Sequence, residues 1–117
     1  MTLESLTPEL LELAYARGFF PMPHPETGDI EWYHPDPRAI IPLDQFHCSR
    51  SLKRSIKRQH FTVKFDRAFA DVMQACGSRE DTWIDDQMLE AYVALHKRGC
   101  AHSVEVYQES QLVGGLY

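Results

Sequence analysis

Phe61-Thr62-Val63-Lys64-Phe65 alternates apolar and polar side chains, which is the pattern of a β-strand with one face buried. Two segments with helical spacing follow, at residues 69–76 and 85–97, and each ends at a glycine. Residues 103–107 and 111–113 then have the composition of two strands joined by a turn. The order strand, helix, helix, strand, strand predicts a mixed α/β (α+β) fold.

Side-chain roles in this region follow from position. Asp66 can cap the first helix, and Asp85 can cap the second. We expect Glu105 to face solvent, because it alternates with two valines on its strand. Gly114-Gly115 indicates either a bulge or the close approach of a ligand. Inner helix faces should carry Phe69, Val72, Met73 and Cys76, and then Met88, Tyr92 and Leu95.

The N-terminal part predicts one further helix. Thr7-Pro8-Glu9 combines a hydroxyl cap, a first-turn proline and an acid, and Gly18 can end the helix in the left-handed conformation. Residues 19–42 are rich in proline and aromatic residues without a clear period, so restricted φ angles should set their shape. We expect Phe19 and Phe20 to form a small core beneath this loop. The apolar helix face should comprise Leu6, Leu10, Leu13 and Ala14.

A stripe of positive charge follows the aromatic-proline segment Trp32-Tyr33-His34-Pro35-Asp36-Pro37-Arg38. Its cations recur at helical spacing, and Leu52 and Ile56 lie off their face, where they can dock the helix. The first three cations lie near the helix N-terminus, where the helix dipole disfavours positive charge by about 0.3–1 kcal/mol each. This placement indicates an anionic partner, with nucleic-acid phosphate as the leading candidate and a solvated charged face as the alternative. The basic stripe consists of Arg50, Lys53, Arg54, Lys57 and Arg58.

Charge is segregated along the chain. The 117 residues carry a net charge of -5, yet residues 47–67 hold seven Lys or Arg against Asp66 alone, a local charge of +6. The remaining residues hold five basic and sixteen acidic side chains, a charge of -11. A basic patch on an acidic body suffices for phosphate binding, because binding depends on the local potential.

The cysteine content and the apolar runs of the sequence indicate the cellular compartment and whether a metal is bound. Three widely spaced cysteines, at 48, 76 and 100, fit a reducing cytosol better than a disulfide framework. No run of about twenty apolar residues predicts a membrane span, and the N-terminus lacks the form of a signal peptide. His96, Cys100 and His102 have no second ligand pair, so we expect no metal.

Because Val113-Gly114-Gly115-Leu116-Tyr117 ends within a strand pattern, we expect a longer protein.

From about residue 10 to residue 117, the chain resembles the bacterial leucyl/phenylalanyl-tRNA–protein transferases. The matching motifs occur in order, and together they are far more specific than any one alone. They are Ala14-Tyr15-Ala16-Arg17-Gly18-Phe19-Phe20-Pro21, Trp32-Tyr33-His34-Pro35-Asp36-Pro37-Arg38-Ala39, His47-Cys48-Ser49-Arg50-Ser51-Leu52, Thr82-Trp83-Ile84, Ala91-Tyr92, Leu95-His96, Ala101-His102-Ser103-Val104-Glu105 and Leu112-Val113-Gly114-Gly115-Leu116-Tyr117.

The resemblance implies an aminoacyltransferase. Such an enzyme moves leucine, phenylalanine or, less readily, methionine from aminoacyl-tRNA to the N-terminal Arg or Lys of a protein, which marks that protein for cytosolic degradation. It also implies a small N-terminal domain, residues 1–59, followed at residues 60–117 by the start of an acetyltransferase-like (GNAT) domain. We expect a monomer without a coenzyme. The catalytic residues should follow Tyr117, so residues 1–117 alone should be inactive.

The resemblance also assigns binding residues. Arg50, Arg54, Lys57 and Arg58 match positions that hold tRNA phosphates, and we include Lys53 from the same stripe. Tyr15, Met22 and Trp83 match positions that border the aminoacyl-adenosine end of tRNA, where an aromatic ring can stack on adenine. Relatives often carry tryptophan at position 22, so Met22 weakens stacking there. Leu116 matches a position in the apolar pocket for the transferred side chain.

Two other functions fit the same sequence. A non-catalytic tRNA-binding module would account for the basic stripe without a complete catalytic site. An acetyltransferase-like enzyme would instead use an acyl-coenzyme A donor, and a glycine loop that cradles pyrophosphate at a helix N-terminus would favour it.

Overall fold

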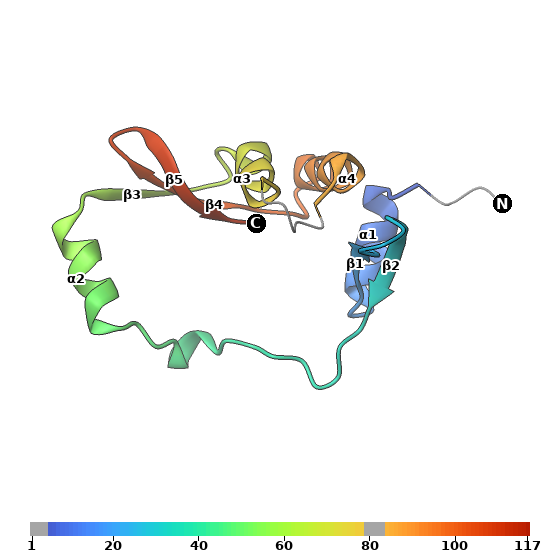
Figure 1. Cartoon of the computed structure of the whole chain (residues 1–117), viewed down its shortest axis with the longest axis horizontal. Helices are drawn as coiled ribbons and strands as arrows, with labels where there is room; N and C mark the ends of the chain where they lie inside the picture. Colours follow the sequence, from blue (N-terminus) through green and yellow to red (C-terminus); the bar gives the residue numbers. More distant parts are fainter. Residues whose placement is uncertain (1–4, 79–83) are drawn as a thin grey trace.

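The structure is a computed structural model that describes residues 5–78 and 84–117. The chain combines helices with antiparallel sheets, which confirms the mixed α+β class (Figure 1). The predicted helices and strands from residue 61 onward are all present. The elements are α1 (Pro8–Ala16), β1 (Phe20–Pro23), β2 (Ile30–Tyr33), the 3-10 helix η1 (Leu43–Gln45), α2 (Arg50–Arg58), β3 (Phe61–Phe65), α3 (Phe69–Cys76), α4 (Asp86–Lys97), β4 (Val104–Gln108) and β5 (Gln111–Leu116).

Helix α1 begins and ends where the sequence predicts. The Thr7 hydroxyl accepts a hydrogen bond from the Leu10 backbone N–H, and Gly18 follows the helix with a φ of +86°. Its buried face is rotated from the predicted one, because Leu11 is fully buried whereas Leu13 is 51% exposed. The predicted face is correct in part, because Leu6 is buried in the core as expected. One residue is 100° of helix rotation, so Leu11 and Leu13 lie on different sides of the helix, and apolar spacing alone chose the wrong one of these two leucines.

The proline-rich segment forms a hairpin that the sequence did not predict. Strands β1 and β2 pair antiparallel from Phe20 opposite Tyr33 to Pro23 opposite Ile30. Two prolines are tolerated in β1 because each strand of a two-stranded sheet has one free edge, where no N–H is needed. Phe19 and Phe20 do not form the expected core: Phe19 is 38% exposed beside His34, and Phe20 stacks on Tyr33.

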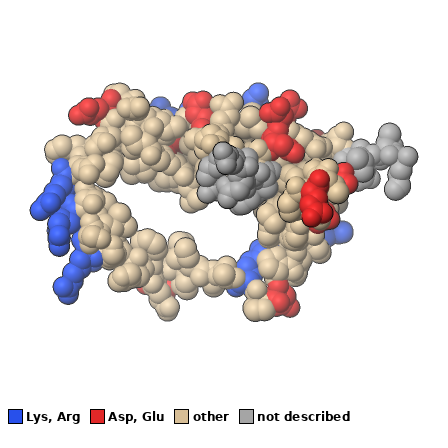
Figure 2. All heavy atoms as spheres, viewed as in Figure 1, with Lys and Arg blue, Asp and Glu red and all other residues tan. Residues whose placement is uncertain are grey.

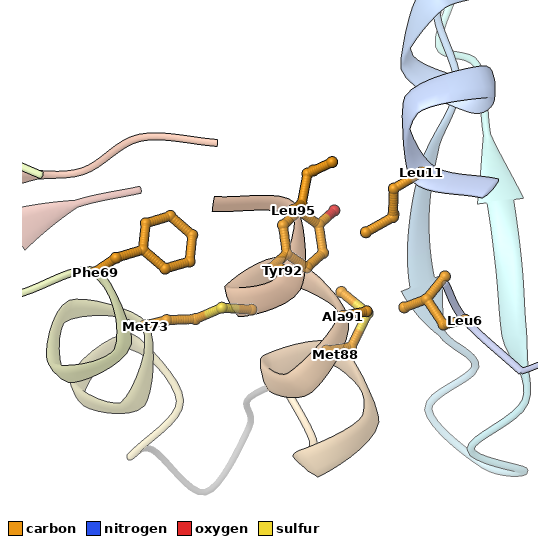
Figure 3. Close-up of a cluster of buried hydrophobic side chains, with 8 residues drawn as sticks. All are labelled: Leu6, Leu11, Phe69, Met73, Met88, Ala91, Tyr92 and Leu95. Carbon is orange, nitrogen blue, oxygen red and sulfur yellow. The ribbon is translucent and has the colours of Figure 1, made fainter. Parts of the chain in front are cut away.

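The core joins the N-terminal helix to the two later helices. Leu6 and Leu11 point from the α1 side toward α4, and Phe69 and Met73 of α3 approach α4 from the other side (Figure 3). Residues on the predicted inner face of α4 are all buried. The core cluster comprises Leu6, Leu11, Phe69, Met73, Met88, Ala91, Tyr92 and Leu95.

The main sheet has the order β3-β4-β5 and carries α3 on one face. Gly115 faces α3, because a Cβ atom built there would lie 2.8 Å from Val72. The register also shifts between Val106 and Tyr107, so Val113 is an extra residue in β5. The glycine pair therefore marks both a bulge and a close approach, although the group that approaches is a helix of the same chain.

We expect Gly115→Ala to lower the free energy of unfolding by about 1–3 kcal/mol, the usual cost of overpacking. The added methyl group would press on Val72 at 2.8 Å and on the Val104 carbonyl oxygen at 3.2 Å. Gly114→Ala is the matched control, since its new methyl group would meet only the Val106 side chain at an ordinary 3.8 Å. Urea denaturation of both variants measures the difference, and equal losses would contradict the close approach.

Glu105 corrects a prediction, because its side chain is fully buried and does not face solvent. The carboxylate accepts hydrogen bonds from the Ser103 hydroxyl and from the Arg67 backbone N–H. It lies on the face of β4 that α3 covers, next to Gly115 across the strand pair. Burial of a carboxylate is tolerated where polar hydrogens reach it, and alternation alone does not reveal those donors.

Asp66 corrects a second prediction, since the residue before α3 is Ala68 and no side chain caps that helix. Asp66 instead has a φ of +56° and turns its carboxylate toward β4. It accepts hydrogen bonds from the Ser103 backbone N–H at 3.0 Å and from His102 Nδ1 at 2.8 Å. These bonds, His102 first, lower the pKa of the Asp66 carboxyl below its usual value.

Residues 34–60 form an arch that leaves β2, carries η1 and α2, and returns to β3 (Figure 1). Side chains along this arch are largely exposed. The space-filling view shows an opening between the arch and the helices above it (Figure 2). Helix α2 is thus presented away from the core cluster.

Candidate nucleic-acid interface

Helix α2 confirms the helix expected from the basic spacing. The Ser49 hydroxyl caps it by accepting a hydrogen bond from the Leu52 backbone N–H at 3.1 Å. Every residue of the helix is exposed, and its Lys and Arg side chains gather at one end of the molecule (Figure 2). The expected docking is wrong: Leu52 and Ile56 are 45% and 53% exposed, because the arch holds α2 away from the core.

The basic stripe has no internal counter-charge in the described part of the chain. No acidic residue occupies the first turn of α2, and no ion pair joins its Lys or Arg side chains to a described carboxylate. Arg50, Lys53 and Arg54 therefore meet the positive end of the helix dipole uncompensated. An anionic partner would relieve this unfavourable electrostatic energy.

A cavity of about 430 Å³ lies where α1, α3, α4 and the chain end meet. The hydroxyls of Tyr15 and Tyr92 are hydrogen-bonded at 2.7 Å, and their rings meet edge to face. Tyr117 contacts Tyr92 with its ring at a steep angle. We call this space the tyrosine cavity; its lining residues are Glu12, Tyr15, Phe69, Tyr92, Leu95, Cys100, Ala101, His102 and Tyr117.

Two phenols of the tyrosine cavity are held neutral. Burial raises the pKa of Tyr92, and the hydrogen bond to Tyr15 raises it further. Burial is also the main cause that raises the pKa of Tyr117. A tyrosine hydroxyl is already neutral near pH 7, and the raised pKa extends the neutral form to more alkaline solution. Both side chains act there as hydrogen-bonding hydroxyls attached to flat apolar rings. Such a cavity suits a flat ligand with a few polar edges.

One wall of the tyrosine cavity is held by contacts between α1 and the end of α4. Arg98 pairs with Glu9 at 2.6 Å and with Glu12 at 2.9 Å. The Cys100 thiol donates a hydrogen bond to the Glu12 carboxylate at 2.9 Å, and this bond is the main cause that raises the pKa of Cys100. A raised pKa keeps Cys100 a thiol rather than a reactive thiolate.

The predicted tRNA-binding and substrate-binding residues do not lie together in the structure. Tyr15 lines the tyrosine cavity, whereas the basic stripe lies at the opposite end of the arch (Figure 1). Met22 is half-buried in β1. Leu116 is 69% exposed on the face of β5 that points away from α3, since adjacent strand residues alternate. Trp83 lies outside the described residues.

Sequence reasoning missed Tyr92 and Tyr117 as lining residues. Helical spacing correctly predicts Tyr92 on the inner face of its helix, but a buried tyrosine hydroxyl also needs a polar partner. That requirement indicates a polar partner for Tyr92, which in the structure is the Tyr15 hydroxyl.

Within residues 5–78 and 84–117, no group of three His, Cys, Asp or Glu side chains could hold a metal ion. No described helix is long and apolar enough to span a membrane.

Two family models cover most of the chain. Residues 4–36 match the leucyl/phenylalanyl-tRNA protein transferase N-terminal domain, and residues 40–117 match leucyl/phenylalanyl-tRNA protein transferase. The chain belongs to this family. Proteins named leucyl/phenylalanyl-tRNA–protein transferase from Herpetosiphon aurantiacus, Salinibacter ruber and Akkermansia muciniphila are 56%, 52% and 51% identical to it.

These matches cover 96–97% of this chain but only 58%, 50% and 61% of the three relatives. The chain thus spans between half and about three fifths of the length of these leucyl/phenylalanyl-tRNA–protein transferases. Both the tyrosine cavity and α2 fall within the matched regions.

Proposed function

We propose that the protein is an aminoacyltransferase that moves leucine or phenylalanine, and less readily methionine, from aminoacyl-tRNA to the N-terminal Arg or Lys of proteins. The modified proteins would then be degraded in the cytoplasm. Family membership supports the reaction class. The observation that carries the tRNA part is α2, whose five exposed cations have no counter-charge among the described residues.

The two ends of the arch would bind different parts of the tRNA. Arg50, Lys53, Arg54, Lys57 and Arg58 would hold backbone phosphates. Tyr15 would border the aminoacyl-adenosine end, and the tyrosine cavity behind it supports this role because its rings offer stacking surfaces. We keep Met22, Trp83 and Leu116 as proposed contacts with the adenosine and with the transferred side chain.

The chemistry needs positioning more than activation. The α-amine of the acceptor protein would attack the ester carbonyl of aminoacyl-tRNA, a peptide bond would form, and the ribose hydroxyl of the tRNA would leave and take up a proton. An ester is already activated toward amines, so no coenzyme is proposed. The reaction needs a neutral amine, an oriented carbonyl and a group that stabilises the developing oxyanion.

We further propose the domain division at residues 1–59 and 60–117, with an acetyltransferase-like (GNAT) fold for the second part and a monomeric protein. The order β3-α3-α4-β4-β5 supports that fold. The packing of α1 against α4 indicates that the two proposed domains would share one core.

Donor preference separates this proposal from an acetyltransferase-like activity. The protein expressed from its complete reading frame should label a peptide with N-terminal Lys from radiolabelled leucyl-tRNA, and should leave it unlabelled with acetyl-coenzyme A. The same peptide with an acetylated N-terminus is the control for reaction at the α-amine. Labelling from acetyl-coenzyme A alone would contradict the proposal.

A further inference from the structure

A pocket lined by two cationic side chains lies on the main sheet, apart from the tyrosine cavity and from α2. It has a volume of about 320 Å³, and we call it the sheet pocket; its lining residues are Thr62, Lys64, Arg67, Tyr107 and Ser110. We propose that the sheet pocket binds a backbone phosphate of the same tRNA that α2 holds. This inference rests on the proposed tRNA-binding function and adds a separate contact to it.

The pairing of the strands gathers the lining side chains on one face. Thr62 lies opposite Tyr107 in the β3–β4 register, and Lys64 follows two residues after Thr62 on the same face. The Lys64 ammonium sits 5.2 Å from the centre of the Tyr107 ring, where the ring electrons attract it. Tyr107 thereby holds one cation over the pocket.

The residues that line the sheet pocket carry cationic and hydroxyl groups. Lys64 and Arg67 supply positive charge, and Thr62, Ser110 and Tyr107 supply hydroxyl groups, while no Asp or Glu is among the lining residues. Charged donors combined with hydroxyls are the side chains that most often contact nucleic-acid phosphates. A phosphate therefore fits the pocket better than a cation or an apolar group.

The nearest carboxylates are already engaged. Glu105 lies opposite Lys64 in the strand register, but it is fully buried and accepts hydrogen bonds from Ser103 and from the Arg67 backbone. Asp66 accepts hydrogen bonds from His102 and Ser103. Glu109, beside Ser110 in the β4–β5 turn, is exposed to solvent and does not line the pocket. No ion pair joins Lys64 or Arg67 to a carboxylate among the described residues, so both side chains can still contact a ligand.

The sheet pocket adjoins the end of α2. Phe61 pairs with Gln108, so the β4–β5 turn lies beside the start of β3, and β3 begins shortly after α2 ends. The Gln108 side-chain amide donates a hydrogen bond to the Gln59 side-chain oxygen at 2.8 Å, which ties the helix end to the sheet. A polynucleotide backbone carries regularly spaced phosphates, so one strand can contact both surfaces.

Lys64→Gln in the protein expressed from its complete reading frame tests the inference. Loss of one phosphate contact should lower the slope of log affinity against log salt by about 0.7–0.9, and should weaken tRNA binding about fourfold to fivefold near 0.15 M salt. Arg67→Gln should act in the same direction. Lys64→Arg, which keeps the charge and the contact with the ring, should retain the wild-type slope.

Lys97→Gln is the matched control, because Lys97 is an exposed lysine at the end of α4. If Lys64→Gln and Arg67→Gln leave the salt slope unchanged while Lys57→Gln lowers it, the sheet pocket does not bind phosphate. The proposed tRNA-binding function of α2 would then still stand. Equal effects of Lys64→Gln and Lys97→Gln on the salt slope would also contradict phosphate binding by the sheet pocket, because the loss of any exposed lysine would then have the same effect. If Lys57→Gln has no effect either, the tRNA role of α2 fails as well.

Discussion

The double variant Lys57→Glu with Arg58→Glu should bind tRNA about 15- to 30-fold more weakly near 0.15 M salt from the loss of two phosphate contacts alone. Each reversed charge then adds repulsion to that loss. The slope of log affinity against log salt should fall by about 1.4–1.8, because two fewer counterions are displaced from the tRNA. Both side chains are exposed in the last turn of α2, so the fold should be retained.

Filter binding of tRNA across a series of salt concentrations measures this slope. Lys97→Glu is the control for the Lys57→Glu change within the double variant. Each lysine lies in the last turn of its helix, so each change loses the same favourable interaction with the helix dipole. Circular dichroism checks that the helices remain. An unchanged salt slope in the double variant would rule out phosphate binding by α2.

The Leu11→Ala variant should lose about 2–5 kcal/mol of unfolding free energy, because it opens a cavity in the core between α1 and α4. Leu11 has no exposed surface and packs in the cluster with Leu6 and the α4 side chains (Figure 3). The same variant should loosen α1 and thus the position of Tyr15. Urea denaturation of the protein expressed from its complete reading frame gives the free energy.

Leu13→Ala supplies the matched comparison on the same helix. It removes the same atoms from a side chain that is 51% exposed, so the expected loss is within about 0.5 kcal/mol. A larger loss at Leu13 than at Leu11 would show that α1 presents its other face to the core, as apolar spacing alone had predicted.

Local signals located the helices and the main strands. Thr7, Ser49 and Asp85 each accept a hydrogen bond from a first-turn N–H, so the helix starts follow from short-range chemistry. Gly18 and Gly99 adopt positive φ angles where helices end. Such contacts join residues close in sequence, which is why the sequence could predict them.

Contacts between distant segments were the ones that sequence reasoning could not supply. Asp66 reaches Ser103 instead of capping α3, and the Arg67 backbone N–H donates to the buried Glu105 carboxylate across 38 positions of the chain. Tyr15 finds Tyr92 across 77 positions of the chain. Each partner becomes visible only when β3 and β4 pair or when α1 packs on α4.

The same distinction between local and distant contacts applies to the candidate site. The basic stripe could be predicted, because helical spacing alone places its charges on one face, and the helix is present at the expected residues. The tyrosine cavity could not, because its rings come from α1, α4 and the last residue of the chain. Its proposed role beside Tyr15 remains a prediction.

Transfer of radiolabelled leucine from leucyl-tRNA to a peptide with N-terminal Lys is the most direct test of the central claim. The protein from its complete reading frame and the 117-residue chain should be assayed side by side. We expect the protein from the complete reading frame to label the peptide at its α-amine. Absence of labelling by both proteins while each still binds tRNA would contradict the transferase assignment and favour a non-catalytic tRNA-binding module.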